Sequence, residues 1–98
     1  MARPESIALE VPKAPGVGHA AQVFRFLEKT VQVGGTFAGS LQLEGSIGGE
    51  EYAAIGAPIT TPALVPVPLT VEFLRVRLLA LASGAPTATF AGFDYRAA

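Results

Sequence analysis

The sequence lacks the residue types from which most chemical sites are built. Cysteine, tryptophan and asparagine are absent, and the 98 residues include one histidine, His19, and one aspartate, Asp94. Without cysteine the chain can form no disulfide, and it offers no thiolate to a metal or a substrate. Zinc sites need several converging ligands and calcium loops need alternating Asp or Asn ligands, so we expect no metal site and no cofactor.

Charged side chains are also scarce. The chain has 7 basic and 8 acidic residues, a net charge of −1, which predicts no electrostatic attraction for nucleic acid or for an anionic membrane. Charged residues make up 15% of the sequence, whereas an average domain has about 25%. A small surface so poor in charge predicts that other copies of the chain, or a partner, cover part of it. A coding bias toward alanine and arginine is the alternative explanation.

Long apolar runs are missing as well. The uncharged, wholly apolar run at 78–82 is the longest of its kind in the strand-like part of the chain, and it is far shorter than the ~18–20 residues that a membrane-spanning helix needs. The N-terminal stretch has no apolar core after its first basic residue, so we expect no secretory signal. These features predict a single domain that stays in the compartment where it is made.

An alternation of apolar and polar residues, broken by glycine, is what the sequence does contain, and it is clearest in segment 30–55. This pattern predicts half-buried β-strands joined by tight turns at Gly34-Gly35 and Gly48-Gly49. One predicted strand would place on a single side Leu27, Lys29, Val31 and Val33. The next would point inward Phe37, Leu41, Leu43 and Ile47, and would turn toward water Gln42, Glu44 and Ser46.

The second half of the chain continues the pattern. Pro62, Pro66 and Pro68 share one parity, so their missing N–H groups would fall on one edge, as in a strand at the border of a sheet; a polyproline-like connector is the alternative. Segment 71–82 fits a strand better than a helix, and segment 86–93 reads as a last strand. The prediction is an all-β, jelly-roll-like antiparallel sandwich of seven or eight strands over 21–98, preceded by an extended, proline-rich arm over 1–20.

No arrangement of residues predicts catalysis. His19 lies in a glycine-rich arm, and an enzyme would require it to act with Asp94 or Glu10 beside a serine. Glu50 and Glu51 are adjacent, so in a strand they would point to opposite faces. We therefore expect a protein that is not an enzyme and that works through contacts with other chains. The candidate partner-interface residues are Ile7, Leu9, Val11, Phe24, Phe26, Phe73, Arg75 and Arg77.

Segment 27–93 resembles a group of small β-sandwich proteins encoded among the virion genes of tailed bacteriophages. The resemblance depends on Gly35-Thr36-Phe37, Tyr52, the strand residues 73–77 and the turn residues 83–86. The sequence departs from that pattern at Gly48-Gly49, where such proteins often have Asp-Gly, and at Tyr52, where they often have Trp. These are glycine, turn and strand residues, and they mark a fold more than an activity.

The resemblance implies a structural protein of the virion, assembled in the host cytoplasm. It implies most specifically a capsid decoration, or cement, protein that forms a homo-oligomer, with a trimer favoured, and that binds the major capsid protein or another virion protein. A tail or head–tail accessory protein is an alternative within the virion. A β-sandwich module that binds carbohydrate or a host surface is an alternative of another class.

Overall fold

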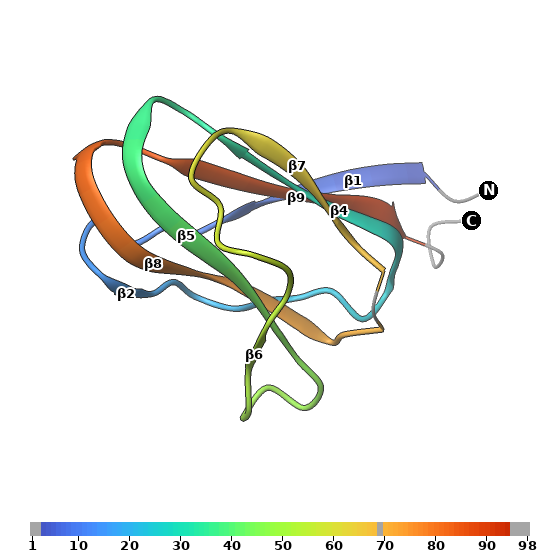
Figure 1. Ribbon diagram of the computed structural model, residues 1–98. Coiled ribbons are helices and arrows are strands. Elements are labelled where there is room, and N and C mark those ends of the chain that lie inside the picture. Colours follow the sequence, from blue (N-terminus) through green and yellow to red (C-terminus); the bar gives the residue numbers. More distant parts are fainter. Residues whose placement is uncertain (1–2, 69, 95–98) are drawn as a thin grey trace.

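The computed structural model describes residues 3–68 and 70–94, and they form a sandwich of two antiparallel β-sheets (Figure 1). Sheet A has the order β1-β9-β4-β7, and sheet B has the order β2-β8-β5-β6 with β3 also paired to β8. The strands of the described residues are β1 (Arg3–Leu9), β2 (Gly16–Val17), β3 (Ala21–Gln22), β4 (Phe26–Gly34), β5 (Phe37–Ser46), β6 (Ala53–Ala54), β7 (Ala63–Val67), β8 (Phe73–Gly84) and β9 (Thr87–Asp94). The all-β sandwich predicted from the sequence is confirmed. The short strands β2, β3 and β6 bring the number above the expected seven or eight.

The core lies between the two sheets, and it follows from the alternation within the long strands. In sheet A, Val31 and Val33 of β4 pair with Phe90 and Ala88 of β9, and these four side chains are buried. Sheet B contributes a matching inner row, also buried, of Leu41, Leu43, Leu74, Val76 and Leu78. The rings of Phe26 and Phe90 meet edge to face, with centroids 4.9 Å apart, a geometry that aromatic pairs favour.

Segment 3–20 contributes to both sheets, and it bends at 13–15 between β1 and β2. β1 pairs along its length with β9, and β2 pairs with β8. Leu9 is 5% exposed and belongs to the core. β7 lies at the border of sheet A, as its prolines predict, because it pairs only with β4. The part of the chain that the structure describes contains no helix long and apolar enough to cross a membrane.

β-bulges change which side chains face the core. Between Leu27 and Thr30, β4 has one more residue than β9, and Glu28 takes a positive φ of 53° there. The extra residue reverses the parity, so Leu27 is 56% exposed and does not share the face of Val31. In β8 similar irregularities occur opposite 38–41, and they accompany the strong bend of β5 and β8 in Figure 1. Leu81 consequently packs against the core, whereas Ala80 is exposed.

Two further side chains do not point where strand alternation would place them. Alternation over 21–26 would set Phe24 and Phe26 on one face, opposite Val23, but the Phe26 amide donates to the Val23 carbonyl at 3.0 Å in a tight turn. Val23 and Phe26 are therefore both buried, and Phe24 is 45% exposed. Ile47 was expected to point inward, but it lies in the turn after β5 and is 72% exposed.

Candidate functional site

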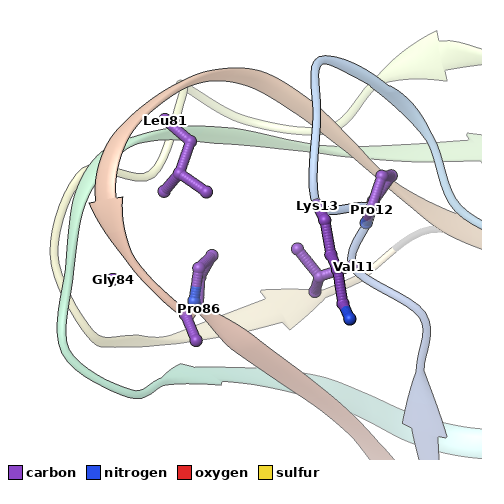
Figure 2. A pocket seen from close by; sticks show the side chains of 7 residues that line it. Val11, Pro12, Lys13, Leu81, Gly84 and Pro86 are labelled. Atoms are coloured by element: carbon purple, nitrogen blue, oxygen red, sulfur yellow. The ribbon is translucent and has the colours of Figure 1, made fainter.

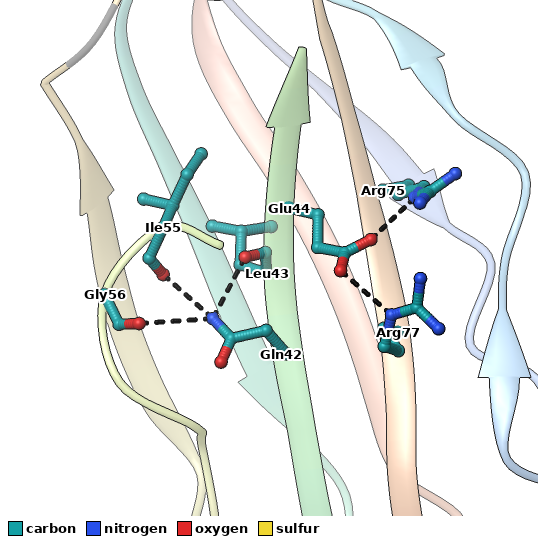
Figure 3. A network of polar contacts seen from close by, with 7 residues as sticks. All are labelled: Gln42, Leu43, Glu44, Ile55, Gly56, Arg75 and Arg77. Atoms are coloured by element: carbon teal, nitrogen blue, oxygen red, sulfur yellow. Dashed lines mark hydrogen bonds and ion pairs between the residues drawn. The ribbon is translucent and has the colours of Figure 1, made fainter. Parts of the chain in front are cut away.

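The outer face of sheet B carries a cluster of charged residues around one carboxylate. Glu44 of β5 is in register with Arg75 of β8, and Gln42 is in register with Arg77, so these side chains share one face of the sheet. Arg75 donates through Nε to Glu44 Oε1 at 2.7 Å, and Arg77 donates through Nε to Glu44 Oε2 at 2.9 Å (Figure 3). The carboxylate of Glu44 thus forms ion pairs with two arginines that lie two residues apart on β8.

Tyr52 covers one side of this cluster. The guanidinium carbon of Arg75 lies 3.7 Å from the centroid of the Tyr52 ring, within the range of a cation–π contact. The contact holds the segment before β6 (Ala53–Ala54) over the outer face of β5. We call Glu44, Tyr52, Arg75 and Arg77 the Glu44 cluster.

Gln42 fastens the segment that follows β6 to the same face. Its Nε2 donates to the carbonyl oxygens of Leu43, Ile55 and Gly56 at 3.1, 3.3 and 3.2 Å (Figure 3). Ser46 acts similarly in the turn after β5, where its Oγ accepts a bond from the Gly49 amide at 3.0 Å. Gln42 and Ser46 thus bond to the backbone of the protein, where side chains of an outward strand face would otherwise bond to water.

The prediction that Gln42, Glu44 and Ser46 face water is therefore wrong. They lie on the outer face of sheet B, as the alternation predicts, but their exposed fractions are only 8%, 8% and 4%. The arginines of β8 and the chain from 49 to 56 fold over them. Every buried side-chain nitrogen and oxygen among the described residues has a hydrogen-bond partner, as the cost of burying an unpaired polar group requires.

The environment of Glu44 lowers its pKa. Burial is the largest single influence and opposes ionisation. The hydrogen bonds from Arg77 and Arg75, together with the charges of both guanidinium groups, outweigh it, so the pKa of Glu44 lies below its ordinary value of 4.5. At neutral pH the cluster holds one negative and two positive charges. Arg77, whose side chain is 39% exposed, can offer its remaining N–H groups to an acceptor on another molecule.

The residues that could form a catalytic group are dispersed. His19 is exposed, and its contact with Glu10 runs from the His19 backbone amide to a carboxylate oxygen, at 3.0 Å. Asp94 forms an ion pair with Arg25 at 2.9 Å. Within 3–68 and 70–94, no three His, Cys, Asp or Glu side chains gather where they could hold a metal ion.

The outer face of sheet A differs from that of sheet B in having no charged residue at its paired outward positions. Crossing the four strands, one row consists of Ser6, Ala91, Thr30 and Pro66. The adjacent row consists of Ala8, Thr89, Gln32 and Leu64. At one end Leu27 pairs with Phe93. We call these two rows and this pair the neutral face.

An open hollow of about 330 Å³ lies at the end of the sandwich where the chain before β2 meets the turn between β8 and β9. Val11, Leu81 and Pro86 give it apolar walls, and Lys13 stands at its side (Figure 2). A second hollow of about 370 Å³ lies beside Tyr52, Ile47 and Val71. Both are shallow and mainly apolar, and neither brings together reactive groups.

The eight predicted interface residues are not all accessible. Leu9 and Phe26 are in the core, at 5% and 1% exposure, and therefore cannot touch a partner while the sandwich is intact. Ile7 and Val11 pack against the core from its border. Phe73 is half-buried, Phe24 is exposed, and Arg75 and Arg77 are joined to Glu44.

Sequence reasoning missed Glu44, Gln42 and Tyr52 as members of a network, and it missed Leu27, Leu64 and Phe93 as exposed apolar residues. One signal for the Glu44 cluster was available, because Arg75 and Arg77 share a strand face and a lone acid has the matching parity in the strand expected before them. The register of β5 against β8, which places Glu44 beside both arginines, could not be predicted from the sequence.

No protein-family model matches this sequence, and no curated protein matches it. Among solved structures, the chain is similar to the crystal structure of SPBc2 prophage-derived protein YomS, with a TM-score of 0.80. The match covers 95% of this chain and 95% of the other, at 14% sequence identity. At that identity the likeness establishes a shared fold along nearly the whole of both chains.

Proposed function

We propose that this protein is a structural component of a tailed-phage particle that acts by binding other protein chains and catalyses no reaction. The observation that carries the proposal is the sandwich shared with a prophage-derived protein over 95% of both chains. The resemblance of residues 35–37, 73–77 and 83–86 to phage virion proteins supports it independently, because that resemblance depends on the sequence alone.

The more specific role that we propose is capsid decoration. A decoration protein lies on the outside of the head and stabilises the shell by contacting neighbouring capsid subunits. The low charge content of the chain and the uncharged, partly apolar neutral face fit a protein that buries its surface against others. The proposed partner is the major capsid protein or another protein of the particle.

Particles of the encoding phage test this role directly. Purified wild-type particles should contain the chain in many copies, and immunogold labelling should place it on the heads. Particles from a phage that lacks the gene should release their DNA at a lower temperature than wild-type particles. Absence of the chain from purified particles, despite its expression in infected cells, would refute a virion role. Gold on the tails would instead support the tail or head–tail accessory role.

A further inference from the structure

We propose that the neutral face is the site where a second copy of this chain docks, with the two sheets A stacked face to face about a two-fold axis. This inference rests on the proposed function, since it names a partner for a protein that acts by association. A two-fold axis requires a patch that complements itself, and the neutral face satisfies that requirement in charge, in apolar content and in area.

The neutral face can meet its own copy without bringing like charges together. When a patch meets its own copy, any charged residue near the axis approaches an identical charge, which costs several kcal/mol in general. The charged residues of the strands of sheet A stand away from the paired outward positions. In β1, Arg3 and Glu5 have the register parity of Ile7 and Leu9, which belong to the inward row. Glu28 and Lys29 lie in the β4 bulge, and Asp94 pairs with Arg25. The outer face of sheet B, by contrast, would bring the positive Glu44 cluster against its copy.

The neutral face also carries large apolar side chains that are exposed to water. Leu64 is 69% exposed, Leu27 is 56% exposed and Phe93 is 37% exposed. These are three of the seven large apolar side chains that are exposed among the described residues, and all three belong to the neutral face. Leu27 and Phe93 are paired neighbours, so their exposed surfaces are continuous, and burying them against a second copy would favour association.

Area and shape are the third argument. Four strands of this length cover a face roughly 20 Å wide and 25 Å long, on the order of 500 Å² per copy. Two copies would bury about 1,000 Å², the size at which specific interfaces begin. Most side chains on the two central strands of the face are small, such as Thr30, Thr89 and Ala91, and therefore allow two sheets to approach to the usual ~10 Å.

The edges of sheet A do not offer an equally good alternative on the β7 side. Pro66 lies within β7, and Pro62 and Pro68 flank it, so of the residues of this parity only Leu64 keeps an N–H group that a further strand could bond. Stacking through the face requires no backbone donors. It yields a dimer, in place of the trimer that the resemblance to decoration proteins implies.

The test is the mass of the purified chain in solution, measured by light scattering and by sedimentation over about 1–200 µM. The wild-type protein should be a dimer at the upper concentrations. The variant Thr89→Lys places a charge at the centre of the neutral face and should weaken the dimer at least about tenfold. Gln32→Lys, on the neighbouring strand, should have the same effect. The matched control is Leu79→Lys, which adds the same charge at an exposed position of β8 and should leave the dimer intact.

Circular dichroism of each variant establishes that the sandwich is folded, so loss of the dimer cannot be attributed to unfolding. A monomeric wild-type chain, a trimer, or a dimer that Thr89→Lys and Gln32→Lys leave unchanged would each overturn the inference. Failure here would leave the virion role standing, because particle labelling does not depend on the oligomeric state. Failure of the labelling experiment would likewise leave the solution dimer standing.

Discussion

Replacing Glu44 by glutamine should destabilise the sandwich, because it removes the negative charge that pairs with both Arg75 and Arg77. The amide has nearly the same volume as the carboxylate, but it has only one acceptor oxygen. In Glu44→Gln one of the two arginine Nε–H groups, now bonded at 2.7 and 2.9 Å, must therefore face an N–H₂ donor. The charge-assisted character of the other bond is reduced as well.

The size of the effect follows from how the cluster is buried. A hydrogen bond to a charged group contributes about 1.5–3 kcal/mol to stability. The side chain of Glu44 is 11% exposed, but those of Arg75 and Arg77 are 20% and 39% exposed, so water screens part of the interaction. We expect Glu44→Gln to lower the free energy of unfolding by about 2 kcal/mol at pH 7. For a domain of this size the midpoint of thermal unfolding would then fall by roughly 8–16 °C.

The effect should disappear in acid, and the direction follows from the pKa. The pKa of Glu44 is lowered in the folded protein, so its ionisation contributes stability above the unfolded-state pKa. That contribution is lost as the pH falls through the folded-state pKa. The difference between wild type and Glu44→Gln should therefore be largest at neutral pH and should shrink below the ordinary carboxyl value of 4.5.

Urea unfolding followed by far-ultraviolet circular dichroism, repeated from pH 3 to pH 7, measures this difference. The matched control is Glu72→Gln, at an exposed residue just before β8, which should change stability by less than about 0.5 kcal/mol. Equal stability of wild type and Glu44→Gln at pH 7 would refute the reasoning. A difference that does not depend on pH would also refute it.

Three further changes test other parts of the structure. Phe90→Ala removes a fully buried ring that packs edge to face against Phe26 and should lower the free energy of unfolding by about 3–5 kcal/mol, as measured by urea unfolding. Gly84→Ala and Gly48→Ala both place a Cβ at a positive φ, near 87° and 90°. The added Cβ meets backbone atoms at Gly84 but nothing at Gly48. Calorimetry should therefore show that Gly48→Ala lowers the free energy of unfolding by about 1–2 kcal/mol and that Gly84→Ala lowers it clearly more. Equal losses of stability would contradict the packing seen at Gly84. Gln42→Leu removes the donor to three carbonyls and should speed hydrogen exchange at the Ile55 amide, whereas unchanged exchange there would show that Gln42 does not fasten the segment.

The strands and the core could be predicted because their cause is local. Val31 and Val33 alternate with Gln32, and the structure buries the valines and exposes the glutamine, since a strand in a sandwich has one wet face. The border position of segment 62–68 could be predicted in the same way, because its three prolines lack the N–H groups that an interior strand donates to its neighbours. Such patterns need no knowledge of which strands are neighbours.

The errors arose where the cause is remote. Alternation correctly assigned Glu44 to the outer face of its sheet, but it could not reveal that Arg75 and Tyr52 would cover that face. Parity also fails beyond a bulge, so the prediction placed Leu27 on the same side as Val31, although the extra residue in β4 turns it outward. The neutral face is a property of four strands together, and it became visible only when the order β1-β9-β4-β7 was known.

The order of sheet A has a consequence for biosynthesis. The last strand, β9, lies in the interior of the sheet between β1 and β4, and Arg3 is paired with Asp94. β1 is synthesised before β9 and therefore has no lasting neighbouring strand until β9 has emerged from the ribosome. Because β1 carries apolar residues that stay uncovered during that interval, the nascent chain should depend on chaperones. Removal of β9 would leave β1 without a partner strand and β4 paired with β7 alone.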